Sequence, residues 1–173
     1  MRTATSRLAA ALVISLLTAL AIAAPAGAIP VSGEQKAVNE TAGRFKMKGD
    51  MLGKFKLTKF VQLHTSPTYA AKGRERFNGC LDLDRDRSCA GDLSGKLFFK
   101  FKYWASFDDD GELQLGTCAH RIVGGTGSFT GATGFLMMVD RPQGGPPGFK
   151  THYEGDINLG FGRPSAAEMP SAC

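Results

Sequence analysis

The chain has 173 residues, with 21 lysines and arginines against 16 acids and a formal net charge of +5. This length corresponds to a single domain that can bury a core of its own. The charge surplus is too small to indicate a nucleic acid partner, and we expect none.

Residues 1–28 have the order of a secretory signal peptide. Arg2 and Arg7 precede an uncharged apolar run over 8–24, and Ala-Gly-Ala at 26–28 closes that run. Basic, apolar and small residues in this order predict cleavage after Ala28. The alternative is an uncleaved anchor, because the run approaches the ~17-residue lower limit of a spanning helix. We predict a secreted or periplasmic protein with no stable membrane insertion after cleavage.

The remaining chain divides into three parts by composition. Residues 29–43 and 161–173 are polar or rich in small residues, so we expect a loose N-terminal segment and a loose C-terminal tail. Residues 44–160 carry the regular apolar patterns and form the predicted β domain.

Apolar residues alternate with polar ones in several runs of this domain, as a half-buried strand requires. The predicted strands cover 54–64, 77–83, 96–107, 112–123, 135–140 and 149–159. In the first of them, Phe55, Leu57, Val61 and Leu63 are expected on one buried face. Helical periodicity is not sustained in any of these runs, so an antiparallel barrel or sandwich is predicted.

Four cysteines lie in the predicted exported part: Cys80, Cys89, Cys118 and Cys173. An even number in an oxidising compartment indicates disulfides, and three pairings are open. Because Cys80 and Cys89 bracket one short polar loop, we favour that bridge and, more weakly, Cys118 with Cys173. Zinc spacing is absent, so no metal site is predicted from the cysteines.

Two acidic stretches have the composition of turns. Asp82, Asp84 and Asp86 alternate as in a calcium loop, but Arg87 replaces the required glycine and Leu93 the terminal glutamate. We therefore expect a solvated loop, with the intervening arginines neutralising the acids. Residues 108–111 predict the turn of a β-hairpin.

The stretch over 121–134 is the most specific in the chain. It resembles the glycine-rich turn of the allene oxide cyclase and dirigent-type barrel superfamily, which lies between two late strands. The matching residues are Gly124, Gly125, Thr126, Gly127, Phe129, Gly131, Ala132 and Gly134. Glycines permit a positive φ, and Phe129 is expected to plug one barrel end. The spacing excludes dinucleotide-binding, phosphate-loop and nucleophile-elbow motifs.

This resemblance implies a closed, antiparallel barrel of eight strands around an apolar cavity. Known members guide cyclisation or radical coupling of hydrophobic molecules, but no catalytic residue transfers to a matching position here. Cavity candidates from the strand pattern are Phe99, Phe101, Tyr103 and Tyr153. His64, His120 and His152 lack the spacing of a metal site, and no metal or cofactor is predicted.

Two classes of function follow from these patterns. We expect a non-catalytic exported module that binds a small hydrophobic ligand or an envelope partner through the barrel mouth. The alternative is an isomerase, cyclase or stereochemical guide acting on a hydrophobic substrate. The patterns do not specify the ligand or the oligomeric state.

Overall fold

In the part of the chain that the computed structural model describes, every regular element is a β-strand. The structure describes residues 27–39, 41–65, 68–143 and 149–160, and within these ranges no helix could cross a membrane. Nearly all of residues 1–28, the predicted signal peptide, and the tail over 161–173 lie outside them. The strands are β1 (Ala28–Asn39), β2 (Arg44–Gly49), β3 (Met51–His64), β4 (Tyr69–Leu81), β5 (Leu93–Phe107), β6 (Leu113–Gly127), β7 (Thr133–Pro142) and β8 (Phe149–Asn158).

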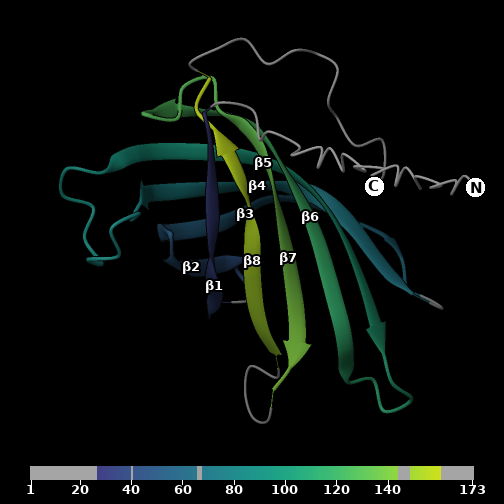
Figure 1. Ribbon diagram of the computed structural model, residues 1–173. Helices are drawn as coiled ribbons and strands as arrows, with labels where there is room; N and C mark the ends of the chain where they lie inside the picture. Colours follow the sequence, from purple (N-terminus) through teal and green to yellow (C-terminus); the bar gives the residue numbers. More distant parts are fainter. Residues whose placement is uncertain (1–26, 40, 66–67, 144–148, 161–173) are drawn as a thin grey trace, which may run out of the picture.

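The strands form one closed antiparallel barrel in chain order (Figure 1). Each strand pairs with its neighbour in sequence, and β1 also pairs with β8 to close the sheet. The fold class predicted from the sequence is confirmed. Its physical origin is clearest in β5, where the inward residues Leu97, Phe99 and Phe101 are buried and alternate with outward side chains.

The segment 29–43 was wrongly expected to be loose. Most of it belongs to β1, which pairs with β8 from Ala28↔Asn158 to Gln35↔Thr151 and with β2 on its other side. The apolar alternation of Ile29 and Val31 stops at Gly33, so the sequence pattern is weak. Pairing on both sides supplies the stability that the local pattern lacks.

The far end of β3 also differs from its predicted pattern. Phe55 is buried, but Val61 and Leu63 are exposed although they were expected on the same face. The register shifts between Leu57 and Lys59 and again between Gln62 and His64. The first irregularity moves the side chains that follow it, including Val61, to the opposite face of the strand, and Leu63 lies within the second.

The two ends of the barrel differ in how they are built. The connections over 50, 82–92 and 128–132 lie at one end, which we call the closed end. The ends of β1, β3, β5 and β7, together with the turn over 108–112, form the other end, the open end; β5 and β7 reach it at the bottom of Figure 1. At the closed end Phe129 is fully buried, and it packs in the core with Ala132 and Leu159.

The glycine-rich stretch forms the predicted turn between β6 and β7. Gly127 has a φ of +67° and Gly131 a φ of +75°, a left-handed conformation that side chains rarely adopt. A Cβ atom on Gly127 would lie 2.6 Å from the Ser94 carbonyl oxygen. The N–H of Ser128 donates to that same oxygen at 3.0 Å, so the turn is tied to β5 and holds Phe129 in place.

The cysteines follow the prediction only in part. Cys80 and Cys89 form the expected disulfide, with their Cα atoms 5.6 Å apart, across the loop between β4 and β5. Cys118 carries a free thiol, so the weaker prediction of a bridge to Cys173 is not met; Cys173 itself lies outside the described residues. The alternation of side chains along β6 places Cys118 on the inner face of the strand, so its thiol lies in the barrel interior.

Replacing Gly127 by valine should destabilise the barrel by about 3 kcal/mol, because the branched side chain strains a positive φ and meets the Ser94 carbonyl. The denaturation midpoint in urea measures this change. Ser128→Ala is the matched control, since it removes one exposed hydrogen bond and should cost less than about 1 kcal/mol. Equal midpoints for parent and Gly127→Val would contradict the structural role of the turn.

Candidate functional site

A group of polar side chains lies inside the barrel, where apolar residues are the norm. We call it the interior polar cluster, and it comes from five different strands. Its members are Glu75, Tyr103, Cys118, His120, Asp140 and Thr151. Buried polar groups are costly unless they have partners, so each contact in this cluster has physical weight.

The deepest contact joins His120 to Glu75. The ring nitrogen Nε2 lies 2.5 Å from Glu75 Oε2, and Nδ1 lies 3.2 Å from the backbone oxygen of Cys118. His120 is 2% exposed and Glu75 9%. Both contacts are satisfied when Nδ1 is protonated and one further proton lies between Nε2 and the carboxyl group. Such a pair can give or take a proton, as general acid–base catalysis requires.

Aromatic side chains surround the histidine. The ring of Phe101 stacks on it with centroids 5.7 Å apart, and Phe55 and Phe99 meet it edge-on. Two predicted cavity residues, Phe99 and Phe101, are therefore packed in the core around His120. They fill the interior at this level and separate the His120–Glu75 pair from solvent.

Cys118 lies next to this pair on β6. Its sulfur is 3.6 Å from His120 Nε2, because residues two apart on a strand share a face. Burial raises the pKa of the Cys118 thiol well above its usual range, and the carboxylates of Glu75 and Asp140 add to this effect. The thiol is therefore protonated and a poor nucleophile at neutral pH.

The cluster continues toward the open end through Tyr103 and Asp140. Thr151 donates to Asp140 Oδ1 at 2.5 Å, and the Tyr103 hydroxyl also hydrogen-bonds this carboxylate. Gly116 lies between them, and a Cβ atom there would lie 2.5 Å from the Tyr103 hydroxyl. Tyr103 and Asp140 are only partly buried, so they are the polar groups of the cluster nearest to the outside.

Tyr153, the fourth predicted cavity residue, has a structural role. Its hydroxyl donates to the Lys48 carbonyl at 2.9 Å and accepts the Met51 N–H at 2.9 Å. These bonds satisfy the hydroxyl and tie β8 to the connection between β2 and β3. Of the four candidates, only Tyr103 keeps a polar atom near the open end.

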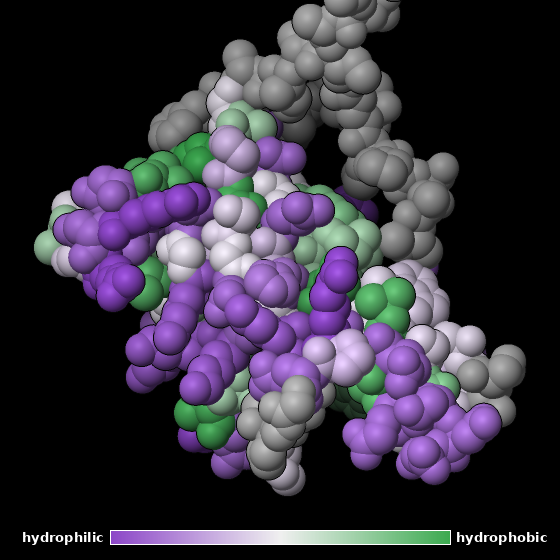
Figure 2. All heavy atoms as spheres, turned by 60° about the horizontal axis from the view of Figure 1, so that its bottom comes forward, coloured by the Kyte–Doolittle hydropathy of each residue, from purple (hydrophilic) through white to green (hydrophobic). Residues whose placement is uncertain are grey.

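Large apolar side chains are exposed near the open end. Phe60 and Phe107 are 49% and 48% exposed, and both stand in the last part of their strands. The others at this end are Val38, Val61, Leu63 and Leu115. Figure 2, which views the molecule toward this end, shows mainly hydrophilic side chains with separate apolar areas among them. The apolar surface is thus divided, which suits a small molecule better than a broad protein interface.

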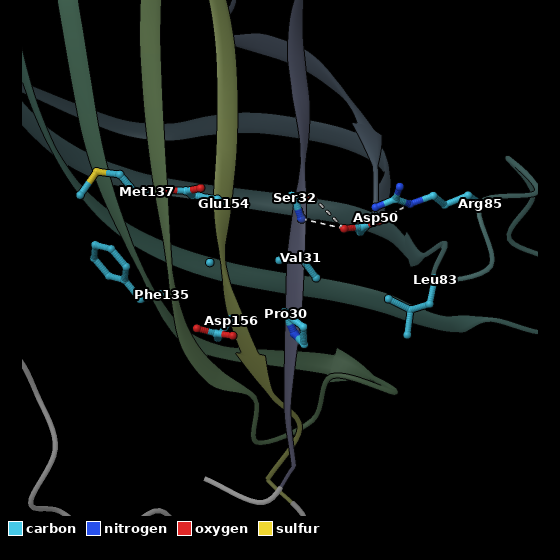
Figure 3. Close-up of a pocket in the computed structure, with 11 residues that line it drawn as sticks. Pro30, Val31, Ser32, Asp50, Leu83, Arg85, Phe135, Met137, Glu154 and Asp156 are labelled. Carbon is cyan, nitrogen blue, oxygen red and sulfur yellow. Dashed lines mark hydrogen bonds and ion pairs between the residues drawn. The ribbon is translucent and has the colours of Figure 1, made fainter. Parts of the chain in front are cut away.

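A hollow lies on the outer wall over β1, β7 and β8 (Figure 3). It is a shallow groove of about 850 Å³ whose polar edge carries Asp50, Glu154 and Asp156. Asp50 accepts from Arg85 Nε at 2.9 Å and from the Ser32 N–H at 2.8 Å. Burial opposes its charge, but these hydrogen bonds prevail and lower the pKa of Asp50. The hydrogen bonds of Asp50 therefore join Ser32 on β1 to Arg85 in the loop after β4.

The three histidines considered as metal ligands do not converge. His120 is buried, whereas His64 and His152 are exposed on β3 and β8. Glu75, Asp140 and Thr151 were not predicted as site residues. Strand parity could have placed Glu75 with Phe77 on the inner face of β4, but only the barrel register brings Glu75 to His120.

Comparisons with known proteins add no relative from which a role could be transferred. No known family, curated protein or solved structure matches the chain. The chemistry of this site is therefore argued from its own geometry.

The Cys118 thiol should resist modification while the barrel is folded. In a Cys173→Ser background, an aromatic disulfide reagent at about pH 8 should react at least about a hundred-fold more slowly with native than with guanidinium-unfolded protein. The reason is burial together with the raised thiol pKa. Cys118→Ala in the same background provides the blank. Rapid release of one thiol equivalent from folded protein would contradict this placement.

The three tyrosines should couple ionisation to unfolding. Burial raises the pKa of Tyr103, Tyr153 and Tyr69, so the folded state keeps phenols neutral that the unfolded chain ionises near pH ~10. The unfolded state then binds fewer protons, and stability is complete below that pH and falls above it. Phenolate absorbance and circular dichroism should change together in an alkaline titration. Tyrosines that titrate normally in a folded barrel would contradict this expectation.

Proposed function

We propose that this barrel is an exported binding module that holds a small, mainly hydrophobic molecule at its open end. The observation that carries the proposal is the asymmetry between the two ends. One end is sealed by the glycine turn and Phe129, whereas the other has exposed Phe60 and Phe107 near a partly buried polar pair.

In this proposal the side chains at the open end supply two kinds of contact. Its apolar part would pack on the exposed side chains at the open end, and a hydroxyl or carbonyl group would reach Tyr103 or Asp140. A site with many apolar contacts and a few convergent polar groups is typical of small-molecule binding. Below this level Phe101 and His120 fill the interior, so the proposed site is at the mouth of the barrel and does not extend through it.

Export belongs to the same proposal. It is supported by the signal-like order of residues 1–28 and by the Cys80–Cys89 disulfide, since such bonds persist in oxidising compartments. Cleavage after Ala28 would remove only the first residue of β1 and leave the pairing with β8 in place. The resemblance to the allene oxide cyclase and dirigent-type superfamily is part of the proposal too, supported by the barrel and its glycine turn.

A second candidate function is an isomerase or cyclase that acts on the bound molecule. The specific observation in its favour is the buried 2.5 Å contact between His120 Nε2 and Glu75 Oε2, with Cys118 beside them. Phe101 covers this pair, so catalysis would require that ring to move away from His120. Binding alone requires no such movement, and we therefore rank it first.

A fluorescent apolar probe such as anilinonaphthalene sulfonate should bind the folded protein at the open end. Phe60→Ser combined with Phe107→Ser should weaken binding at least about ten-fold, which corresponds to ~1.4 kcal/mol of lost contact. Probe fluorescence against protein concentration measures this change. Phe98→Ser is a matched control, since Phe98 is 37% exposed on the outer wall of β5.

Two further variants separate the alternatives. Phe135→Ser changes the outer groove, so loss of probe binding in this variant alone would place the ligand there and contradict the proposal. Glu75→Gln should leave probe binding unchanged. If ligand extracted from the source protein is converted to an isomer by the parent but not by Glu75→Gln, the catalytic alternative is correct.

A further inference from the structure

The loop between β4 and β5 brings three acidic side chains together at the closed end of the barrel. Asp82, Asp84 and Asp86 each offer one carboxylate oxygen, and these oxygens all lie within 4.8 Å of one another. The sequence pattern predicts a solvated loop in which the arginines neutralise the acids. The placement of the side chains differs from that expectation in two respects.

The first difference concerns Asp82, which is 2% exposed. Its Oδ2 accepts the backbone N–H of Arg87 at 3.0 Å, whereas Oδ1 is buried and has no hydrogen-bond partner among the described residues. A buried carboxylate oxygen without a donor is strongly unfavourable. A cation bound at this oxygen would remove that penalty.

The second difference concerns the arginines. Arg85 forms its ion pair with Asp50, which lies outside the cluster (Figure 3). Arg87 forms no ion pair with any side chain that the structure describes. Asp92 adds a fourth negative charge nearby: partial desolvation and the charges of Asp84, Asp82 and Asp86 raise its pKa. Negative charge therefore accumulates here without a bound countercharge.

The backbone holds these carboxylates in place. Arg85 and Arg87 have φ values of +61° and +65°, and these left-handed turns curl the chain so that alternate side chains converge. Arg87 thus adopts a positive φ at the position where a calcium loop carries its invariant glycine. The Cys80–Cys89 disulfide encloses the same segment.

We propose that this loop binds one Ca²⁺ ion through the carboxylates of Asp82, Asp84 and Asp86. The donors are all oxygens, which hard cations prefer, and both neighbouring cysteine sulfurs are committed to the disulfide. Two oxygens that share a Ca²⁺ ion lie at most about 5 Å apart, which fits the observed separation. Water molecules and backbone carbonyls complete the coordination.

The remaining oxygens of the two exposed acids are available for the ion. Asp84 Oδ1 accepts the Asp86 N–H at 3.3 Å, and Asp86 Oδ1 accepts the Ser88 N–H at 2.6 Å. Asparagine retains the accepting Oδ1 but removes the charge. The double variant Asp84→Asn with Asp86→Asn therefore preserves the loop while it weakens the proposed site.

The test uses protein with its disulfide intact, freed of metal by a chelator, and follows binding of CaCl₂ by calorimetry. We expect one site with a Kd of about 10⁻⁴ to 10⁻³ M, the range of extracellular calcium modules. The double variant should bind at least about ten-fold more weakly. Asp109→Asn with Asp110→Asn is the matched control, because it removes two charges from the exposed turn between β5 and β6 and should bind like the parent.

Thermal unfolding gives a second, signed readout. In chelator the Asp84→Asn and Asp86→Asn variant should melt at or above the parent temperature, because it relieves repulsion. In about 10 mM CaCl₂ the order should reverse, because only the parent gains stability from the ion. No saturable binding, equal binding by parent and variant, or an equal rise in NaCl of the same ionic strength would overturn the proposal. An equal response to MgCl₂ would overturn the assignment to calcium.

Discussion

Closure of the hydrogen-bonded sheet is the constraint on which the rest of this structure depends. An open sheet exposes two rows of unpaired backbone groups, and closure removes both edges at once. Here closure rests on β1, which pairs with β2 and with β8. In a barrel of eight strands the interior is just wide enough to be filled by side chains. The inward residues therefore determine whether the interior is apolar or polar.

Within that limit the chain builds two unlike ends. Phe129 and the glycine turn fill the closed end with apolar atoms, and the turn is tied to β5 by backbone hydrogen bonds. Toward the open end the inward residues become polar, from His120 and Glu75 to Asp140 and Thr151. Burying these groups lowers the free energy of unfolding, because apolar residues of similar volume would fill the same space more favourably. Packing alone therefore does not explain them. The binding role proposed above would account for their presence.

Much of the fold could be predicted from local pattern, but the site could not. Alternation identified β5 because its inward residues Leu97, Phe99 and Phe101 are apolar, and spacing identified the Cys80–Cys89 bridge. β1 was missed because its inward positions after Val31 include glycine and glutamine, so its strand character comes from its partners. Bulges in β3 reversed the faces of Val61 and Leu63 in a way that no sequence period reveals. Glu75 and His120 are 45 residues apart in sequence, and only the register across β5 brings them together.

An amide chemical-shift titration with the apolar probe tests the proposed binding of a small molecule at the open end most directly. We expect the largest shifts at Phe107, Gly116 and Thr151, with Gly127 and Phe129 at the closed end unchanged. Shifts centred on Glu154 and Asp156 in the outer groove, or spread evenly over both ends, would contradict it.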